Sequence, residues 1–196
     1  MSLLNRLAEA VAEAVQVKKR LVAEQGEQVI AAAHLLADSL KAGGKILLFG
    51  NDGSAADAQH LAAEFVNRFQ VERPPLAAVA LTTDTSILTA VANDYDFREV
   101  FAKQVQALGR AGDVAVGLST SGSSPNVVAG LLAAREGGLR TLALSGGDGG
   151  PVAKAAELAI IVPSRNTPRI QEVHITVGHV LCDLVDYLLF PEKFTD

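Results

Sequence analysis

The chain has 196 residues, of which 49% are hydrophobic and 20% charged, and 17 basic against 22 acidic side chains give it a net charge of −5. This length suits one domain with a sizeable core, and the lack of a basic excess argues against non-specific binding to nucleic acid or an anionic membrane. No apolar run reaches the ~18–20 residues of a membrane span, and the single Cys182 cannot form an internal disulfide, so we expect a cytoplasmic protein.

Residues 3–41 carry apolar side chains at helical spacing, and we interpret this stretch as two helices that end at the glycines of "KAGG" (41–44). The apolar positions are Leu4, Leu7, Val11 and Val15 in the first helix, and Val29, Ala33, Leu36 and Leu40 in the second. Together these faces exceed what one small sheet needs to cover. We therefore expect one of the two helices to pack against another subunit.

Downstream, the pattern alternates between short apolar runs, typical of buried strands, and longer helical stretches. The predicted strands span 45–50, 76–81, 113–119, 141–145 and 158–163. The predicted helices span 54–69, 85–92, 97–108, 125–137, 151–156 and about 168–190. This alternation predicts a three-layer α/β fold, in which a parallel five-stranded sheet has helices on both faces. We expect a single domain over 1–196, with N-terminal helices for oligomer packing over 1–44 and an α/β core over 45–196.

The turns after the predicted strands are the candidate sites, because such sheets bind ligands at the carboxyl ends of their strands. "GNDGSAAD" follows the first strand and "STSGSSPN" the third, while "SGGDGGP" and "PSRNTPRIQ" follow the fourth and fifth. Backbone N–H groups and hydroxyls of "STSGSSPN" can bind phosphate without a lysine, but a serine-rich turn that caps the next helix explains these residues equally well. Since neither G-x-x-x-x-G-K-[ST] nor G-x-G-x-x-G occurs in these turns, P-loop and dinucleotide sites are not expected.

His60 and Glu64 lie four residues apart, on one face of the helix that follows the first turn. The pair suits a metal or acid–base site, but pairs of this kind are also common on protein surfaces. Gln171 and His179, eight residues apart on the last helix, lie on roughly one face and ~12 Å apart along its axis, which suits two ends of a substrate. With one cysteine and four histidines, any metal site must use His, carboxylate or amide ligands.

Other polar residues have simpler explanations. The dipole of its helix accounts for Asp57 in the first turn. We expect His34 and His174 to be structural, and Glu172 to lie in solvent or at an interface.

Four motifs occur in order along the chain: "GNDGSAADAQHLAAEF", "ALTTDTSILTAVANDY", "STSGSSPN" and "RIQEVHITVGH". Together they resemble the sugar isomerase (SIS) family, and within it the phosphoheptose isomerases, over almost the whole chain. The resemblance implies a flavodoxin-like SIS fold and an aldose–ketose isomerase that converts sedoheptulose 7-phosphate into D-glycero-D-manno-heptose 7-phosphate through an enediol(ate). This reaction is the first step of ADP- or GDP-heptose precursor synthesis, which can supply lipopolysaccharide. The resemblance also implies a homotetramer with sites at subunit interfaces, where Glu64 and His179 would come from different chains.

The resemblance further implies a role for each matching residue. Glu64 would be the catalytic base and His179 its acid–base partner, which agrees with a reaction that moves protons between adjacent carbons and between their oxygens. The substrate-binding residues would be Asn51, Asp52, Gly53, Glu64, Asn93, Asp94, Ser119, Thr120, Ser121, Ser124 and Gln171, with the four hydroxyl residues on the phosphate. The ligands of one zinc ion per subunit would be His60, Glu64, Gln171 and His179.

Asp52 departs from the family pattern, which usually has glycine as the second residue of this turn. Aspartate tolerates a left-handed backbone better than most residues, so we expect the turn to survive. Its carboxylate could repel the substrate phosphate, or it could instead hydrogen-bond sugar hydroxyls or contact the metal.

Two further functions compete with the enzyme. One is a non-catalytic SIS-fold tetramer that binds a replication-initiator protein, a branch that shares "RIQEVH" but replaces the base and its partner. Because Glu64 and His179 are both present here, the enzyme is favoured. The other is a sugar-phosphate-sensing regulator, which would carry a DNA-binding domain that the N-terminal segment does not resemble.

Overall fold

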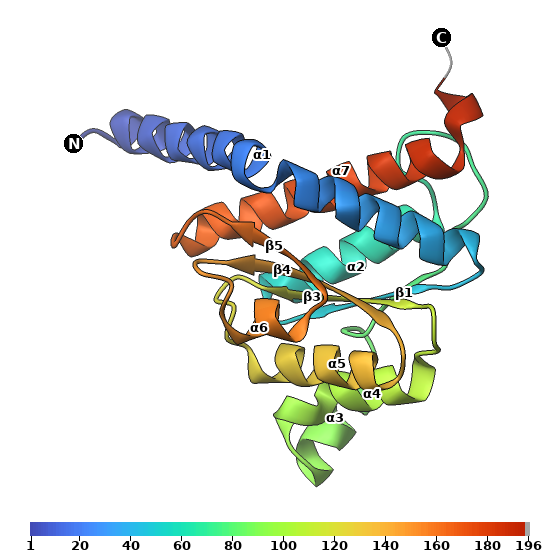
Figure 1. Ribbon diagram of the computed structural model, residues 1–196. Coiled ribbons are helices and arrows are strands. Elements are labelled where there is room, and N and C mark those ends of the chain that lie inside the picture. The colour runs from blue at the N-terminus through green and yellow to red at the C-terminus, as the bar shows by residue number, and fades with distance from the viewer. Residues whose placement is uncertain (195–196) are drawn as a thin grey trace.

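The computed structural model describes residues 1–194, in which five parallel strands are surrounded by helices, as predicted (Figure 1). The strands are β1 (Ile46–Gly50), β2 (Ala78–Ala80), β3 (Val114–Ser119), β4 (Arg140–Gly146) and β5 (Leu158–Val162). They pair in the order β2-β1-β3-β4-β5, so the strand order reverses between β1 and β3. The loops after β1 and β3 are therefore neighbours at the carboxyl edge of the sheet, where folds of this kind bind ligands.

Helices cover both faces of the sheet, and the two sets lie above and below it in Figure 1. One face carries α1 (Leu3–Lys41), α2 (Gly53–Val66) and α7 (Thr167–Leu189), and the other carries α4 (Val100–Leu108), α5 (Pro125–Glu136) and α6 (Gly150–Ala155). Beyond α4 and α5 lie α3 (Thr85–Asp94) and the 3-10 helix η1 (Phe97–Glu99), and η2 (Pro191–Lys193) follows α7. None of the helices over residues 1–194 has the length and apolarity needed to cross a bilayer.

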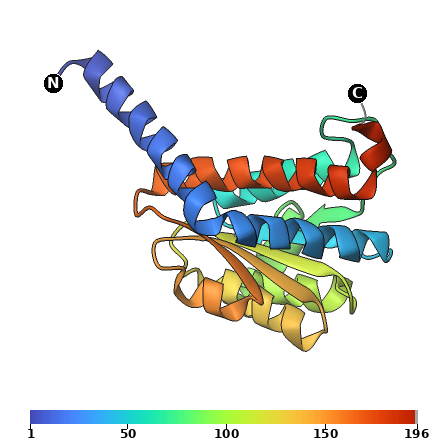
Figure 2. The ribbon, with the colours of Figure 1, turned by 45° about the horizontal axis from the view of Figure 1, so that its top comes forward.

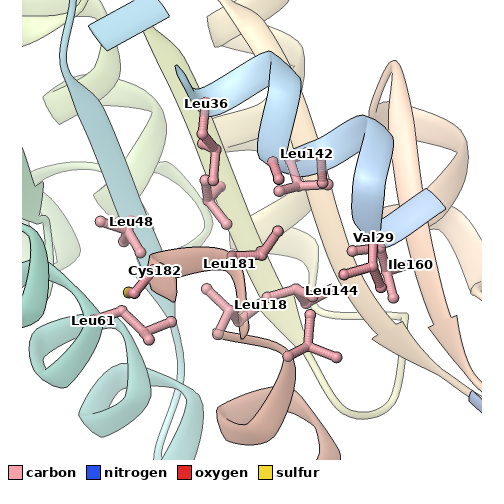
Figure 3. Packing of buried hydrophobic residues seen from close by; sticks show 14 of the residues in the cluster. Val29, Leu36, Leu48, Leu61, Leu118, Leu142, Leu144, Ile160, Leu181 and Cys182 are labelled. Atoms are coloured by element: carbon pink, nitrogen blue, oxygen red, sulfur yellow. The ribbon is translucent and has the colours of Figure 1, made fainter. Parts of the chain in front are cut away.

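The core has two halves, because successive side chains of a strand point to opposite faces of the sheet. On β1, Ile46 and Leu48 face α1, α2 and α7, while Leu47 and Phe49 face α4, α5 and α6. Figure 3 shows the first half, where side chains of α1, α2 and α7 meet those of the sheet. Burial on both faces explains why β1 and β3, which are buried at every position, are continuous apolar runs in the sequence.

The N-terminal stretch is one continuous helix of 39 residues, so the prediction of two helices was wrong. Gly26 lies inside it without breaking it, since a glycine in a helix interior costs only about 1 kcal/mol relative to alanine. The helix ends before Gly43, whose φ of +84° turns the backbone as the glycine pattern predicted.

The two apolar stripes of α1 have different surroundings. Val29, Ala33 and Leu36 are buried in the core of this same chain, so the expectation that this stripe exceeds what the sheet can cover was wrong. The earlier stripe is exposed, at 72% for Leu4 and 61% for Leu7, where α1 projects past the rest of the molecule (Figure 2). A partner for the projecting half of α1 stays a prediction.

Candidate active site

A cavity of about 420 Å³ opens where the loops after β1 and β3 meet the start of α7. It is lined by Asn51, Asp52, Gly53, Ser54, Leu118, Ser119, Thr120, Ser121, Ser124, Thr167 and Gln171. Three of the predicted motifs thus meet at one place, although they are far apart in the sequence. The lining contains eight of the eleven residues predicted to bind substrate, and the described chain contributes neither lysine nor arginine to it.

The serine-rich loop after β3 forms a cluster of hydroxyls in this cavity. Ser119 Oγ lies 2.9 Å from Ser124 Oγ and 3.4 Å from Ser121 Oγ. The Ser124 side chain makes no capping hydrogen bond to α5 within residues 1–194, so the alternative of a simple helix-capping turn is not what the structure shows. Hydroxyls beside the N-terminus of α5 provide donors and a favourable helix dipole for an anion.

Gly122 allows this loop to pass close to its neighbour. Its φ is +68°, and a Cβ there would lie 2.7 Å from the carbonyl oxygen of Gly149. Only glycine fits such a close approach in this conformation.

Asn51 and Asn126 join the two loops through reciprocal amide hydrogen bonds. The Asn51 amide donates to Asn126 Oδ1 at 2.9 Å, and the Asn126 amide donates back to Asn51 Oδ1 at 2.8 Å. Asn126 is buried, and its Oδ1 also accepts the N–H of Val127 at 3.0 Å. Asn126 was not among the predicted site residues, although its place at the end of "STSGSSPN" was a signal.

Asp52 has φ +50° and ψ −122°, and it is the one non-glycine residue with positive φ within residues 1–194. These angles match the first central position of a type II′ turn, which glycine dominates, and not the left-handed helical region that aspartate tolerates. The tolerance argued from the sequence therefore does not apply, and the turn survives with backbone strain. At the next residue a Cβ would lie 2.8 Å from Gln171 Oε1, so Gly53 admits the Gln171 side chain.

His60 brings Glu64 and His179 together within one chain. His60 Nε2 lies 2.8 Å from His179 Nε2 and 3.5 Å from Glu64 Oε1. The His179 ring also stacks on Phe69, with 5.5 Å between ring centroids. Glu64 and His179 are therefore already close within a single chain. Their action from different chains of an assembly stays a prediction. The cluster lies seven residues along α2 from Gly53, which is about 10 Å along the helix axis.

Gln171 also contacts Asp57, a residue that the helix dipole alone was expected to explain. Its amide donates a hydrogen bond to Asp57 Oδ2. Burial raises the pKa of Asp57, while the hydrogen bond from Gln171 and the charge of His60 oppose that rise. Asp57 follows the first turn of α2, so its explanation by the helix dipole was incomplete.

Asn93 and Asp94 do not line the cavity of their own chain. They are exposed at the end of α3, where the Asn93 amide donates to Asp94 Oδ1 at 2.8 Å. The residues closer to the site come from the next segment, since Asp96, Phe97 and Arg98 line a smaller cavity of about 250 Å³ that also contacts Asn51 and Ser124.

The residues expected to be structural lie outside the cavity. His174 is fully buried, and burial lowers its pKa to about 4 even though Nε2 lies 3.2 Å from the Ser145 carbonyl oxygen. His34 is exposed on α1, and Glu172 accepts a hydrogen bond from Arg169 at 2.6 Å. Burial also raises the pKa of the Cys182 thiol, which makes it an inert core residue.

The predicted zinc ligands are only partly brought together within one chain. Within residues 1–194, no group of three or more His, Cys, Asp or Glu side chains is arranged to hold a metal ion. Three of the four predicted donors nevertheless meet pairwise at His60, and imidazole with carboxylate is a donor set that zinc accepts. Two ring nitrogens on one tetrahedral zinc ion lie about 3.3 Å apart, so a separation of 2.8 Å requires only a small movement of the rings.

Comparisons with known proteins agree over nearly the whole chain. A sequence profile of the SIS domain matches residues 10–146. The phosphoheptose isomerase of Solidesulfovibrio magneticus is 57% identical over 187 residues, which is 95% of this chain and 91% of that protein. The solved structure of phosphoheptose isomerase from Neisseria gonorrhoeae has a TM-score of 0.89 at 48% identity, covering 94% of this chain and 99% of that one. The corresponding structure from Francisella tularensis has a TM-score of 0.91 at 36% identity, covering 95% and 99%.

Proposed function

Since the chain belongs to the SIS-domain family, we propose that it is a phosphoheptose isomerase, which converts sedoheptulose 7-phosphate into D-glycero-D-manno-heptose 7-phosphate. The observation that carries this proposal is the meeting of Glu64 and His179 at His60, about 10 Å along α2 from a cavity lined by hydroxyls. That separation suits a long sugar chain whose phosphate and reacting carbons lie at opposite ends. The proposed product is a heptose precursor for lipopolysaccharide or another heptose-bearing glycan.

In the proposed mechanism Glu64 moves the carbon-bound proton. Aldose–ketose isomerisation transfers a proton between two adjacent carbons through an enediol(ate), so one carboxylate can abstract the proton and return it. His179 transfers protons on the two substrate oxygens, a task that suits an imidazole near neutral pH. Each neutral ring has one N–H, so in the His60–His179 hydrogen bond one ring donates and the other accepts.

The hydroxyl cluster holds the phosphate at the far end of the substrate. Ser119, Thr120, Ser121 and Ser124 offer hydroxyl donors beside the N-terminus of α5. Asn51, held by Asn126, offers an amide to the sugar between the two ends. Binding energy from this remote group then positions the reacting carbons against Glu64.

We also propose that His60, Glu64, Gln171 and His179 bind one zinc ion per subunit. When bound, zinc would polarise the substrate carbonyl and stabilise the developing oxyanion. Metal analysis of the dialysed protein tests this part: we expect about one zinc per chain, and much less after His60→Gln. A wild-type protein that retains no zinc from a zinc-containing buffer would contradict it.

The proposed assembly is a cytoplasmic homotetramer with sites at subunit interfaces. Two observations support it: the exposed apolar stripe of α1, and the placement of Asn93 and Asp94 outside the cavity of their own chain. These two residues would reach substrate only from a neighbouring copy. Native mass spectrometry should show four chains, and a fully active monomer would contradict the proposal.

The decisive experiment is direct. Purified protein is incubated with sedoheptulose 7-phosphate, and formation of an aldoheptose 7-phosphate is followed by chromatography and mass spectrometry. Conversion that disappears in Glu64→Gln supports the proposal. A folded wild-type protein that converts nothing, with or without added zinc, overturns the proposal. The alternative of a non-catalytic binding protein would then be favoured.

A further inference from the structure

Arg73 is a buried cation in the loop between α2 and β2. The exposed fraction of its side chain is 0%, which is rare for an arginine unless its charge and its N–H groups are satisfied. Nη1 donates to the carbonyl oxygens of Phe65 at 2.7 Å and of Asn67 at 3.2 Å. Nη2 donates to the carbonyl oxygen of Glu64 at 3.0 Å.

These carbonyls belong to the end of α2. The last carbonyl groups of a helix have no intrahelical donors and carry the negative end of the helix dipole. The final turn of α2 holds no basic residue of its own, so Arg73 supplies both donors and positive charge from outside the helix. One of the bound carbonyls is that of Glu64, the proposed base. Arg73 thus fixes the backbone on which the base is carried.

The carboxylate that pairs with Arg73 lies on the helix that carries His179. Arg73 Nε donates to Asp186 Oδ1 at 2.8 Å, and the Asp186 side chain is 2% exposed. Asp186 comes seven residues after His179, about two turns further along α7. The ion pair therefore ties the end of α2 to α7 on one side of the Glu64–His179 pair.

A second contact holds α2 and α7 together on the other side of this pair. A Cβ added to Gly178 would lie 2.5 Å from Leu61 Cδ2, so the two helices touch closely there. Leu61 precedes Glu64 by one turn, and the carbonyls bound by Arg73 begin at Glu64 itself. The base and its partner lie between a tight apolar contact and a buried ionic one.

We propose that Arg73, acting through Asp186, is a positioning residue that sets the placement of Glu64 relative to His179 during isomerisation. This inference rests on the proposed function. A buried ion pair is seldom the most stable way to fill such a space, because an apolar pair of similar size is often as stable. The directional hydrogen bonds of the guanidinium define one arrangement of the two helices, which an apolar pair would not do.

The test compares full-length variants in steady-state assays with sedoheptulose 7-phosphate. Arg73→Met keeps the size of the side chain but removes its donors and charge. We expect kcat to fall by about 10- to 100-fold, since a displacement of about 1 Å can have an effect of this size. KM should change less than about threefold, because the cavity that would hold the phosphate does not include Arg73. Arg73→Lys should recover part of kcat, since an ammonium can still pair with Asp186.

A matched control is the ion pair between Lys45 and Asp113 at the other end of the sheet. Lys45 Nζ lies 2.5 Å from Asp113 Oδ2, and the Asp113 side chain is 5% exposed. Lys45→Met removes a partly buried ion pair before β1, far from the carboxyl edge. It should lower stability while leaving kcat per folded molecule within about twofold of wild type.

The possible results separate this inference from the proposed function. An Arg73→Met protein that is folded and retains wild-type kcat overturns the positioning role, as does an equal loss of kcat in Lys45→Met. If Arg73→Met does not fold, Arg73→Lys and Asp186→Asn decide in its place, and wild-type kcat in both overturns the proposal.

A wild-type protein that does not isomerise the sugar phosphate overturns the proposed function. The ring ¹⁵N shifts of His60 and His179 then test the positioning: we expect them to change in Arg73→Met and not in Lys45→Met, and unchanged shifts contradict it.

Discussion

His60 Nε2 of α2 lies 2.8 Å from His179 Nε2 of α7, although 119 positions separate the two residues in the sequence. His60 therefore contacts the partner ring directly, in addition to any role in metal binding, and the His179 ring lies between His60 and Phe69. The same nitrogen lies 3.5 Å from Glu64, so the proposed base and its acid–base partner share one neighbour. This geometry brings the two residues close together within a single chain.

Glu64→Gln should abolish isomerisation while leaving the fold and substrate binding nearly unchanged. Glutamine keeps the size of the side chain but cannot accept the carbon-bound proton, so we expect kcat to fall at least ~10²-fold. Glu72→Gln is the matched control, because the Glu72 side chain is 86% exposed and its only described ion pair is with Arg68. Steady-state kinetics measure both variants, and turnover near wild type in Glu64→Gln would remove Glu64 as the base.

Asp52→Gly should stabilise the protein. Its φ of +50° with ψ of −122° is strained for any residue with a Cβ, and relief of such strain is expected to raise the free energy of unfolding by about 1 kcal/mol. KM should fall as well if the carboxylate repels the substrate phosphate in the cavity that it lines. Denaturant unfolding and steady-state kinetics give the two results. A higher KM would show instead that Asp52 binds sugar hydroxyls or metal.

Asn126→Asp should weaken substrate binding more than catalysis. The aspartate can still accept from the Asn51 amide and from Val127 N–H, but it cannot donate to Asn51 Oδ1. We expect the free energy of unfolding to fall by about 1–2 kcal/mol and KM to rise about tenfold. Asn5→Asp, at an exposed position in the first turn of α1, should change neither. An unchanged KM in Asn126→Asp would mean that the amide pair does not orient Asn51 for binding.

His174 should make stability depend on pH. Its folded-state pKa of about 4 lies below the usual 6.5, so the unfolded chain binds the proton more readily. The neutral ring therefore contributes full stability above pH 6.5, and this contribution is lost as the pH falls from 6.5 towards 4. His174→Gln keeps a donor for the Ser145 carbonyl but does not titrate. Chemical denaturation from pH 7.5 to 4.5 should show a smaller decline for the variant, and parallel curves would contradict the assignment.

Mixing Glu64→Gln chains with His179→Gln chains should restore almost no activity. Each chain contributes both residues to one cluster around His60, so every mixed site keeps one defective residue. Subunit exchange must first be confirmed by native mass spectrometry of differently labelled chains. Recovery of about a quarter of wild-type activity after exchange would show that the two residues pair between chains in the assembly.

The order of elements and much of the cavity followed from the sequence. The apolar runs predicted all five strands. The signal is strongest for β1 and β3, which are buried at every position and so need apolar side chains on both faces. The motifs after the first and third strands predicted most of the cavity lining, because the carboxyl ends of parallel strands lie at one edge of the sheet. Local geometry was also predictable where a glycine was required, as at Gly43 after the end of α1.

The contacts between distant segments were decided only by the tertiary structure. Nothing in the local pattern joins Arg73 to Asp186, which are 113 positions apart, or Asn51 to Asn126, which are 75 apart. The burial of the second stripe of α1 likewise depends on the core side chains of α7 and the sheet that it packs against. Periodicity reports which face of a helix is apolar. Which side chains pack against that face depends on how the helices cross and on how deeply each polar group is buried. Both are properties of the packed molecule.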